Sequence, residues 1–294
     1  MGRLFVVATP IGNLGDITLR AVETLRTVRL IAAEDTRRTR QLLRHLQLTT
    51  PLLSYHAHNQ RMRQPRLLAE LAQGDVALVS DAGTPVVSDP GAELVAAAAA
   101  AGNEVLSVPG PSAPVAALSV CGFSAPSFHC VGFLPRRSGE RRRALAAMAG
   151  WPGNMILFEA PHRLRATLAD LLEVFGDRQV AVCCELTKLF EHVERTTLAG
   201  AVAYYQEMEP RGEFTLVVAG GQGPAQGPAR DVAGGAGASV GNAQRGLEER
   251  FGALLAAHGD RKRALAALAV ETGLPRKVLY ARLMTGAAGQ KGPA

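Results

Sequence analysis

The sequence predicts an α/β fold, because a strand-like apolar run, a turn of small residues and a helix-forming stretch follow one another three times within the first 122 residues. The apolar runs lie at 4–8, 76–79 and 104–108. The turns read TPIGNLGD (9–16), SDAGTP (80–85) and PGPSA (109–113). The helix-forming stretches are 17–28, 91–101 and 112–122. In an open α/β sheet, turns that follow strands line the ligand crevice at the carboxyl edge, so these turns are the predicted site.

The first loop lacks the common nucleotide-binding motifs. Its glycines, Gly12 and Gly15, do not form the GxGxxG pattern of dinucleotide sites, and the Gly-Lys pair of a P-loop does not follow. Glycine and alanine let a backbone approach a ligand closely, whereas proline fixes the direction of the chain. The loops are therefore predicted to bind a ligand that those motifs do not describe. Asp16 is the predicted N-cap of the helix at 17–28, and Asp89 is predicted to be a turn and N-cap residue.

Length and composition are typical of a soluble globular protein with two domains. The chain has 294 residues, of which 47% are hydrophobic and 20% are charged. The alanine-rich stretch 95–101 is too short to span a membrane, and the first strand follows Arg3 so closely that no room is left for a signal peptide. We therefore expect a cytoplasmic protein that has no membrane partner.

The four cysteines predict neither a metal site nor a disulfide framework. They show no C-x-x-C spacing, and two of them, Cys183 and Cys184, are adjacent in an apolar run. Buried thiols in a reducing compartment explain this pattern better.

The net charge of +6 and the isoelectric point near 9.5 favour an anionic partner, and the distribution of arginine says more than the total. Two clusters each fall within eight positions: Arg37, Arg38, Arg40 and Arg44, and then Arg136, Arg137, Arg141, Arg142 and Arg143. An ordinary solvated surface is an equal alternative for each cluster. The first adjoins Glu34 and Asp35 beside the predicted site, which favours contact with phosphate.

The elements beyond residue 122 predict a second α/β domain, to which the chain crosses near 126–128. Strands are expected at 128–131, 155–159, 179–184, 193–198 and 214–219, and helices at 141–148, 161–175 and 201–208. The two predicted domains are therefore 1–122 and 123–220.

The last part of the chain is predicted to be a flexible linker at 221–245, rich in Gly and Ala, and a basic helix-turn-helix-like module at 246–286. The helices of the module are expected at 261–269 and 275–284, with a tight turn at 271–274. Eight Lys/Arg against four Asp/Glu between 245 and 285 favour a role in RNA contact. A plain helical hairpin used for dimerisation is the alternative.

Six segments occur between about residues 3 and 220 in an order and spacing shared with a known family. They are ATPIGNLGD (8–16), AEDTR (33–37), the stretch 80–91, PGPSA (109–113), FEAPHR (158–163) and ELTK (185–188). Together they resemble the tetrapyrrole methylase superfamily and, within it, the bacterial 16S ribosomal RNA (cytidine-2'-O)-methyltransferases. The resemblance implies two α/β domains with a cofactor cleft between them, S-adenosyl-L-methionine as cofactor, and methylation of the ribose 2'-oxygen of a cytidine in the small ribosomal subunit.

The resemblance also implies which residues hold the cofactor. The methionine and ribose parts would lie against 81–83 and 109–113, and the adenine near 157–159 and the strand after Glu213. The cofactor-binding candidates are Pro10, Asp81, Ala82, Gly83, Pro109, Ser112, Ala113, Leu157, Phe158 and Glu213.

The catalytic candidates follow from the chemistry of a ribose hydroxyl, whose pKa lies far above neutral. The protein must hold the attacking oxygen in line with the methyl group and stabilise or accept its proton. Lys188 is the first candidate, as a cation that lowers the pKa of the hydroxyl or as a base, and a salt bridge to Glu185 or Glu191 is the alternative. Glu159, Glu185 and His162 are further candidates as acceptors, although His162 has capping or packing as its alternative.

Arg37, Arg38 and Arg163 are the RNA-binding candidates, and the expected partner is 16S ribosomal RNA in the assembled small subunit. No metal ligand is expected, and the resemblance implies a homodimer. Two other functions stay open. Methylation of a tetrapyrrole of the uroporphyrinogen type keeps the fold, but the arginine clusters and the basic module count against it. A non-catalytic RNA-binding or assembly protein is the other, and the intact turns count against that.

Overall fold

The computed structural model describes residues 2–87, 89–124 and 127–221, together with 250–252, 254–256, 259–272 and 279. The chain forms two compact units, Met1–Ala225 and Gln226–Ala294, and the first unit contains two separate sheets. The predicted linker at 221–245 lies outside the described residues apart from Gly221. Among the helices of the described ranges, none is both long and apolar enough to cross a membrane.

The first sheet is entirely parallel, as the alternation of strands and helices predicts. Its strands are β1 (Leu4–Val7), β2 (Leu30–Ala33), β3 (Leu52–Ser54), β4 (Val76–Val79) and β5 (Val105–Val108). They lie in the order β3-β2-β4-β1-β5. Every residue of β2 and β4 is buried, because helices cover both faces of the sheet.

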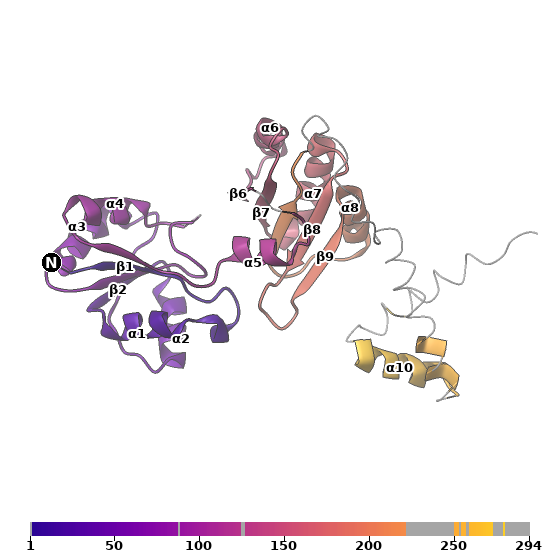
Figure 1. The fold of residues 1–294 in the computed structure, drawn as a ribbon, viewed down its shortest axis with the longest axis horizontal. Helices are drawn as coiled ribbons and strands as arrows, with labels where there is room; N and C mark the ends of the chain where they lie inside the picture. The colour runs from indigo at the N-terminus through magenta and orange to yellow at the C-terminus, as the bar shows by residue number, and fades with distance from the viewer. Residues whose placement is uncertain are drawn as a thin grey trace, which may run out of the picture. The chain divides into compact units, whose positions relative to one another are not determined.

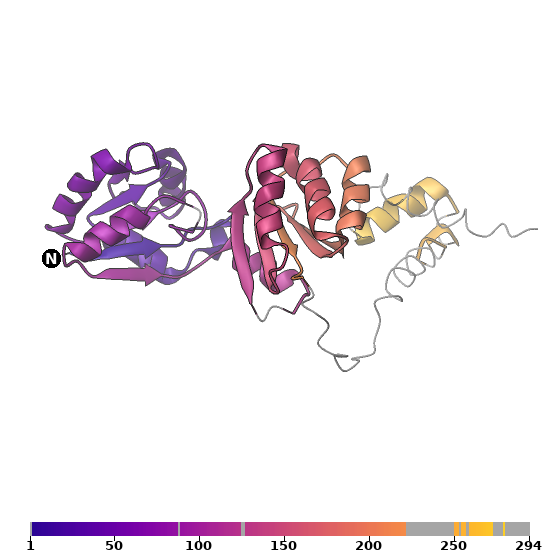
Figure 2. The same cartoon turned by 90° about the horizontal axis from the view of Figure 1, so that it is seen from above.

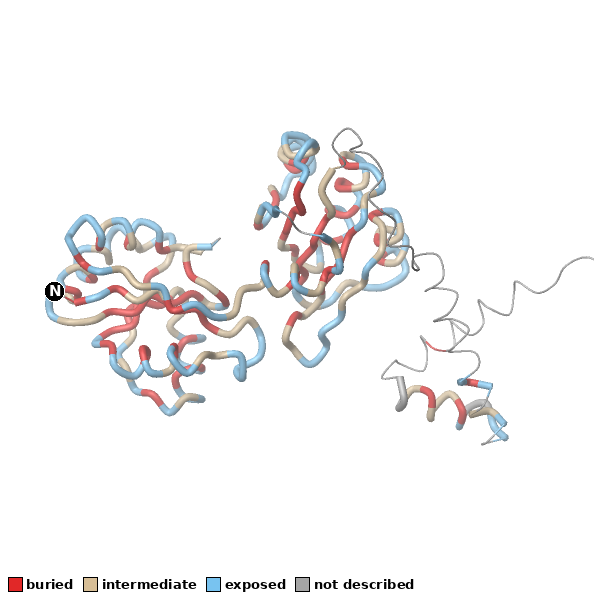
Figure 3. The backbone as a smooth tube through the Cα atoms, in the orientation of Figure 1, coloured by how far each residue is buried: buried red, intermediate tan, exposed pale blue. Residues whose placement is uncertain are grey.

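Four helices form these two layers. They are α1 (Leu19–Thr27), α2 (Thr36–His45), α3 (Gln60–Leu71) and α4 (Ala92–Ala100), and a short 3-10 helix, η1 (Leu14–Asp16), precedes α1. Helices α3 and α4 pack on one face of the sheet and α1 and α2 on the other (Figure 1). The buried residues are concentrated in the strands between these layers (Figure 3).

The second sheet is mixed and has the order β6-β7-β10-β8-β9. Its strands are β6 (Phe128–Phe133), β7 (Asn154–Glu159), β8 (Gln179–Cys184), β9 (His192–Thr197) and β10 (Phe214–Val218). Only the pair β6–β7 is parallel. Helices α6 (Ser138–Met148), α7 (Pro161–Phe175) and α8 (Leu198–Glu207) cover one face (Figure 2), and α5 (Ala113–Val120) packs on the other.

Two predicted helix caps are wrong. Asp16 lies in η1, and the N-cap of α1 is Thr18, whose side chain accepts a hydrogen bond from the backbone of Ala21. The cause is that Asp16 ends the 3-10 turn and the extended residues Ile17 and Thr18 lie between it and the helix. Asp89 does not cap α4 either, because the N-cap position is Gly91, with a φ of 139°.

In the second unit, α10 (Arg261–Thr272) contains the first predicted helix and runs on into the first half of the predicted turn. Phe251, Ala264, Leu268 and Leu279 form a small apolar cluster. Phe251 belongs to helical residues at 250–252 that the sequence pattern does not predict. The second predicted helix, 275–284, lies outside the described residues apart from Leu279.

Candidate functional site

The three predicted turns are joined by hydrogen bonds at the carboxyl edge of the first sheet. Thr9 and Gly83 exchange two backbone hydrogen bonds of 2.9 Å each. Thr9 Oγ1 donates to the carbonyl of Ser80 at 3.2 Å, and Thr84 Oγ1 donates to the carbonyl of Pro111 at 3.3 Å. The loops that follow β1, β4 and β5 therefore act as one surface.

Gly83 is a residue of this surface at which glycine is required. Its φ is +77°, a conformation that side-chain-bearing residues rarely adopt. A Cβ added at this position would lie 3.3 Å from Cγ2 of Ile11. A larger residue at Gly83 would therefore combine backbone strain with crowding of the neighbouring loop.

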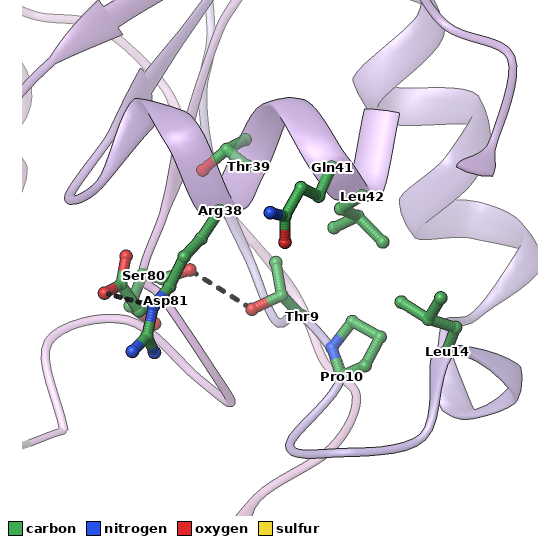
Figure 4. A pocket seen from close by; sticks show the side chains of 9 residues that line it. All are labelled: Thr9, Pro10, Leu14, Arg38, Thr39, Gln41, Leu42, Ser80 and Asp81. Carbon is green, nitrogen blue, oxygen red and sulfur yellow. Dashed lines mark hydrogen bonds and ion pairs between the residues drawn. The ribbon is translucent and has the colours of Figure 1, made fainter. Parts of the chain in front are cut away.

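One pocket lies between the joined loops and α2 (Figure 4). It is lined by Thr9, Pro10, Leu14, Arg38, Thr39, Gln41, Leu42, Ser80 and Asp81. Nε of Arg38 lies 3.6 Å from Oδ2 of Asp81 (Figure 4). The side chain of Asp81 also accepts a hydrogen bond from the backbone of Asp35 at 2.9 Å, which links the loop after β4 to the start of α2.

A second pocket is lined by residues of both α/β domains. Its residues are Ile11, Ala82, Gly83, Thr84, Val87, Asp89, Ser112, Ala113, Pro114, Phe133, Phe158 and Glu213. Six of the ten cofactor candidates lie here: Ala82, Gly83, Ser112, Ala113, Phe158 and Glu213. Residues from β6, from β7 and from the position just before β10 thus meet the turns of the first sheet at one cavity.

The other four cofactor candidates are placed differently. Pro10 and Asp81 line the first pocket, and Pro109 lines neither. Leu157 is 1% exposed and packs in the core of the second domain. Because successive side chains of a strand point to opposite faces, the side chain of Leu157 points away from the pocket that its neighbour Phe158 lines.

Two carboxyl groups near these pockets have altered pKa values. Burial is the main cause that raises the pKa of Asp89 to about 6, and the negative charge of Glu34 adds to it. Burial also raises the pKa of Glu34, whose carboxylate accepts a long hydrogen bond of 3.4 Å from the backbone of Asp81. Negative charge held in a partly buried cavity favours a cationic ligand.

Lys188 lies between two carboxylates. Its Nζ is 2.8 Å from Oε1 of Glu185 and 3.0 Å from Oε2 of Glu213. Burial lowers the pKa of Lys188, but the hydrogen bonds to Glu185 and Glu213 outweigh this, so the pKa stands above its usual value. An ammonium that holds its proton this firmly cannot serve as a base near neutral pH. The alternative of a salt bridge with Glu185 is therefore present in the structure.

The loop that carries Lys188 is strained and touches the first domain. Glu185 and Thr187 have φ angles of 52° and 66°, which are rare for residues with side chains. A Cβ added at Gly12 would lie 2.5 Å from Cγ of Lys188, so only glycine fits at this point of the loop after β1. Strain of this kind persists where surrounding contacts enforce it and is concentrated at functional sites.

Two further catalytic candidates, Glu159 and His162, have different environments, and that of Glu159 indicates a structural role. Glu159 is 2% exposed; its Oε1 accepts from the backbone of Ala160 at 2.9 Å and its Oε2 from Oγ1 of Thr167 at 2.6 Å. Its carboxylate is thus used at the start of α7. His162 is exposed on the first turn of the same helix and lines neither pocket.

The structure argues against Arg163 as an RNA contact. Its side chain is only 16% exposed and forms an ion pair of 3.2 Å with Glu159. Nη2 donates to the carbonyls of Leu134 and Pro135 at 2.7 and 3.2 Å. These groups already occupy the guanidinium, and contact of Arg163 with RNA stays a prediction.

Arg37 and Arg38 are exposed on α2. The side chain of Arg37 is 84% exposed and pairs with Asp35, the N-cap of the helix, at 2.7 Å. Hydrogen bonds from Arg37 lower the pKa of Asp35 to about 2. The side chain of Arg38 is 63% exposed. Both guanidinium groups are accessible to a large anionic partner.

Three residues of the site, Gly12, Glu34 and Phe133, are not sequence candidates. Gly12 belongs to the motif at 8–16, but its contact with Lys188 joins two segments that are distant in the sequence, so the motif alone does not reveal it. Phe133 stands just before the second arginine cluster, and that position is the one signal that could have drawn attention to it. A β-bulge between Cys130 and Gly132 sets its direction, and strand periodicity does not reveal such an irregularity.

Within the described ranges, no three or more His, Cys, Asp or Glu side chains are arranged to hold a metal ion. Cys121 and Cys183 are buried, whereas Cys130 and Cys184 are partly exposed. Burial raises the pKa of Cys183 to about 12, which leaves that thiol unreactive at neutral pH.

Comparison with known proteins shows the family. Residues 3–202 match the model for Tetrapyrrole (Corrin/Porphyrin) Methylases. A protein of Synechocystis sp. named Ribosomal RNA small subunit methyltransferase I is 48% identical over 282 residues, which are 95% of this chain and 96% of that protein. A protein of the same name from Micromonospora olivasterospora is 45% identical over 99% of this chain and 90% of its own length. The chain belongs to the tetrapyrrole methylase family, among the ribosomal RNA small subunit methyltransferase I proteins.

Solved structures agree with this fold. A uroporphyrin-III C-methyltransferase from Thermus thermophilus, complexed with S-adenosyl homocysteine, has a TM-score of 0.55. It is 21% identical to this chain, and the match covers 74% of this chain and 97% of that one. The likeness establishes for this family member the fold of two α/β domains that the sequence resemblance implies.

Proposed function

We propose that this protein is an S-adenosyl-L-methionine-dependent methyltransferase that methylates the RNA of the small ribosomal subunit. The observation that carries the proposal is the pocket at which the turns of the first sheet meet Phe158 and Glu213 of the second domain. The relatives that share nearly the whole length of the chain are named for methylation of this RNA. A shared architecture alone would not choose between substrates.

The pocket residues fit the methyl donor. When bound, S-adenosyl-L-methionine supplies an electrophilic methyl group on a positively charged sulfur. Asp89 and Glu213 provide negative charge for such a cation, and Phe158 provides an aromatic face for adenine. Gly83 and Ala82 present the backbone without bulky side chains, so a ligand can approach the loop closely.

The finer proposal is transfer of the methyl group to the ribose 2'-oxygen of a cytidine in 16S ribosomal RNA. It rests on the resemblance of the motifs at 33–37 and 158–163. The exposed Arg37 and Arg38 beside the first pocket supply the charge that an RNA backbone requires. A tetrapyrrole of the uroporphyrinogen type is also anionic, so the choice of RNA rests on the relatives that are named for it and not on this charge.

In this reaction the protein acts mainly by positioning, since holding the hydroxyl in line with the methyl group removes much of the barrier. Lys188 acts as a fixed cation and not as a base, because its two carboxylate partners keep it protonated. Through its ion pair with Glu213, Lys188 also holds a carboxylate that lines the cofactor pocket. Lys188 is thus a positioning residue.

The remaining parts of the proposal concern assembly. The protein works as a homodimer in the cytoplasm on the assembled small subunit, and the basic module at 246–286 adds affinity for RNA. The charge of that module supports this role, whereas a dimerisation hairpin would not need it.

Two measurements test the proposed function. Calorimetry with S-adenosyl-L-methionine should give a saturable binding curve, and the absence of binding would favour a non-catalytic assembly protein. Small subunits from a strain that lacks the gene should then accept one methyl group, which mass mapping of nuclease fragments would locate. Methylation of a base, or methylation of uroporphyrinogen in place of RNA, would refute the cytidine 2'-O assignment.

A further inference from the structure

Phe133, at the end of β6, is an exposed aromatic residue at the edge of the proposed cofactor pocket. The residue is 63% exposed although it lines the pocket together with Phe158. The two rings have centroids 5.5 Å apart and planes inclined at 53°. Exposure alone does not mark a site, because Phe190 is 78% exposed and lies outside the lining of this pocket; Phe133 is distinguished by being an exposed ring that lines a binding cavity.

The backbone of β6 turns this ring toward the pocket. A β-bulge shifts the register of β6 between Cys130 and Gly132, and Gly132 adopts a φ of 72°. After the bulge, Phe133 pairs with Phe158 of β7, whereas Leu134 returns to the core at 4% exposure. Bulges of this kind re-aim side chains and recur next to active sites.

Two guanidinium groups, the buried one of Arg141 and the partly buried one of Arg163, hold the segment that follows Phe133. Arg163 donates to the carbonyls of Leu134 and Pro135 at 2.7 and 3.2 Å. Arg141 donates to the carbonyl of Arg136 at 3.2 Å. Three successive carbonyls are therefore bound by charged donors, which fixes a short stretch of chain at the surface.

These anchors are themselves locked in place. Arg163 is paired with Glu159, whose carboxylate is fully buried. Arg141 is 4% exposed, and its Nε donates to Asp170 at 2.7 Å. Two buried ion pairs thus support one exposed segment, and such pairs serve structural specificity more than net stability. The rigid support is what a preorganised contact surface requires.

The exposed side chains of this segment combine an aromatic ring with positive charge. Arg136 is exposed, and the side chain of Arg137 is 86% exposed with one long contact of 3.5 Å to Glu140. Proteins bind unpaired nucleotides by stacking bases on aromatic rings beside a basic surface that holds the phosphates. Methylation of a ribose requires the target nucleotide to enter the pocket, so its base must lie near the pocket edge.

We infer that Phe133 stacks on the base of the target nucleotide, and that Arg136 and Arg137 hold the adjoining phosphates. This inference rests on the proposed function and names the substrate contact of the same site. The base is unstacked from its RNA neighbours and lies against the exposed face of Phe133. Phe158, which is less exposed, is left for the adenine of the cofactor.

The test compares Phe133→Leu with a matched control, Phe128→Leu. Phe128 lies on the same strand and is 46% exposed, but it does not line the pocket. Leucine keeps an apolar side chain and removes the ring. Two kinds of small subunit are assembled in vitro. In the first, the RNA nucleotide that the wild-type enzyme methylates is intact. In the second, that nucleotide is replaced by an abasic ribonucleotide that keeps its 2'-hydroxyl.

With the intact nucleotide, Phe133→Leu should raise the half-saturating subunit concentration about five- to fiftyfold, as expected for the loss of one stacked base. With the abasic nucleotide, wild type and variant should agree within about twofold, because the stacking partner is missing from both. Affinity for S-adenosyl-L-methionine and the oligomeric state should not change, and Phe128→Leu should resemble wild type on both substrates.

An equal loss on both substrates would overturn the inference, as would no loss on either. A parallel loss of cofactor affinity would assign the ring to adenine, and a change of oligomeric state would assign it to a second copy of the chain. Failure of the wild type to methylate small subunits would refute the proposed function and the inference with it. That result differs from the outcomes above, in which the wild type is active and only the Phe133 variant decides.

Discussion

Arg37 and Arg141 belong to arginine clusters of similar density, yet 84% of the Arg37 side chain is exposed and only 4% of the Arg141 side chain. The difference comes from the neighbouring elements. Helix α7 presents Asp170 and Glu173 to α6, and these residues pair with Arg141 and Arg142. Among the described residues, the four arginines on α2 face no acidic helix of this kind; Arg37 pairs with Asp35, Arg38 pairs with Asp81, and the cluster stays a basic surface.

The comparison shows that charge density along a sequence does not separate a binding surface from a structural clamp. In the second cluster both occur together, because Arg141 is a buried anchor while Arg136 and Arg137 remain exposed. In the first cluster, Arg37 and Arg38 lie beside the acidic loop that contains Asp81. Each of the following predictions tests one part of this division between anchoring and binding residues.

The largest effect is expected for Arg141→Ala. Removal of the guanidinium leaves the buried carboxylate of Asp170 with the hydroxyl of Ser138 and a 3.9 Å contact to Arg142, and loss of its main cation costs about 3–5 kcal/mol of stability. Trp151, the single tryptophan, lies between α6 and β7, so its fluorescence in a urea titration reports on this domain. Arg142→Ala is the control and should cost much less, since its pair with Glu173 is exposed and its Nε is 3.9 Å from Asp170. Similar losses in both variants would contradict the division.

Gly83→Val should come next, with affinity for S-adenosyl-L-methionine reduced about 10- to 100-fold. The branched side chain crowds Ile11 and must adopt a φ of +77°, so some stability is lost as well. Calorimetry measures the affinity, and circular dichroism checks the fold. Gly139→Val is the control, because nothing lies within 4 Å of a Cβ added there. Unchanged cofactor affinity in folded Gly83→Val would remove this turn from the site.

Lys188→Met should lower the single-turnover rate about 10- to 100-fold, because Glu213 and the strained loop lose their common cation. Lys188→Arg should retain most of the activity, since a positioning cation can be replaced by another cation. Because the pKa of Lys188 is raised above its usual value, the residue should stay charged and add no limb to the pH–rate profile between pH 6 and 9. Complete loss of activity in Lys188→Arg, together with a limb in the wild-type pH–rate profile between pH 6 and 9, would favour Lys188 as a base.

The sequence predicts the elements around this site well and the contacts across it poorly. The loops of β1, β4 and β5 and all five strands of the second sheet follow from apolar runs and turns. Elements β2, β3, α2 and α3 were not individually predicted, because their apolar runs are short or are mixed with arginine. The Gly12–Lys188 contact and the bulge before Phe133 depend on tertiary packing, which no local pattern contains.

Asp89→Asn should have a moderate effect that depends on pH. With its pKa at about 6, Asp89 is mainly neutral at pH 5 and mainly ionised at pH 7. A carboxylate attracts a cationic cofactor more strongly than a carboxylic acid, so wild-type affinity should rise about three- to tenfold over this range. The variant should show a flatter profile. Glu34→Gln is the matched control. If cofactor affinity still rises with pH in Asp89→Asn but not in Glu34→Gln, the titrating group is Glu34.

The smallest effect is expected for Arg37→Ala, which should weaken binding of small-subunit RNA about two- to threefold at moderate salt. Loss of one phosphate contact should also reduce the slope of log affinity against log salt concentration by about one. Arg211→Ala is a close control, because its side chain is also 84% exposed and pairs with a carboxylate two residues away, that of Glu209. Both substitutions remove one exposed, paired charge, so a general effect of net charge would change the two slopes equally. A change confined to Arg37 would place the phosphate on α2, beside the pocket that Arg38 and Asp81 line.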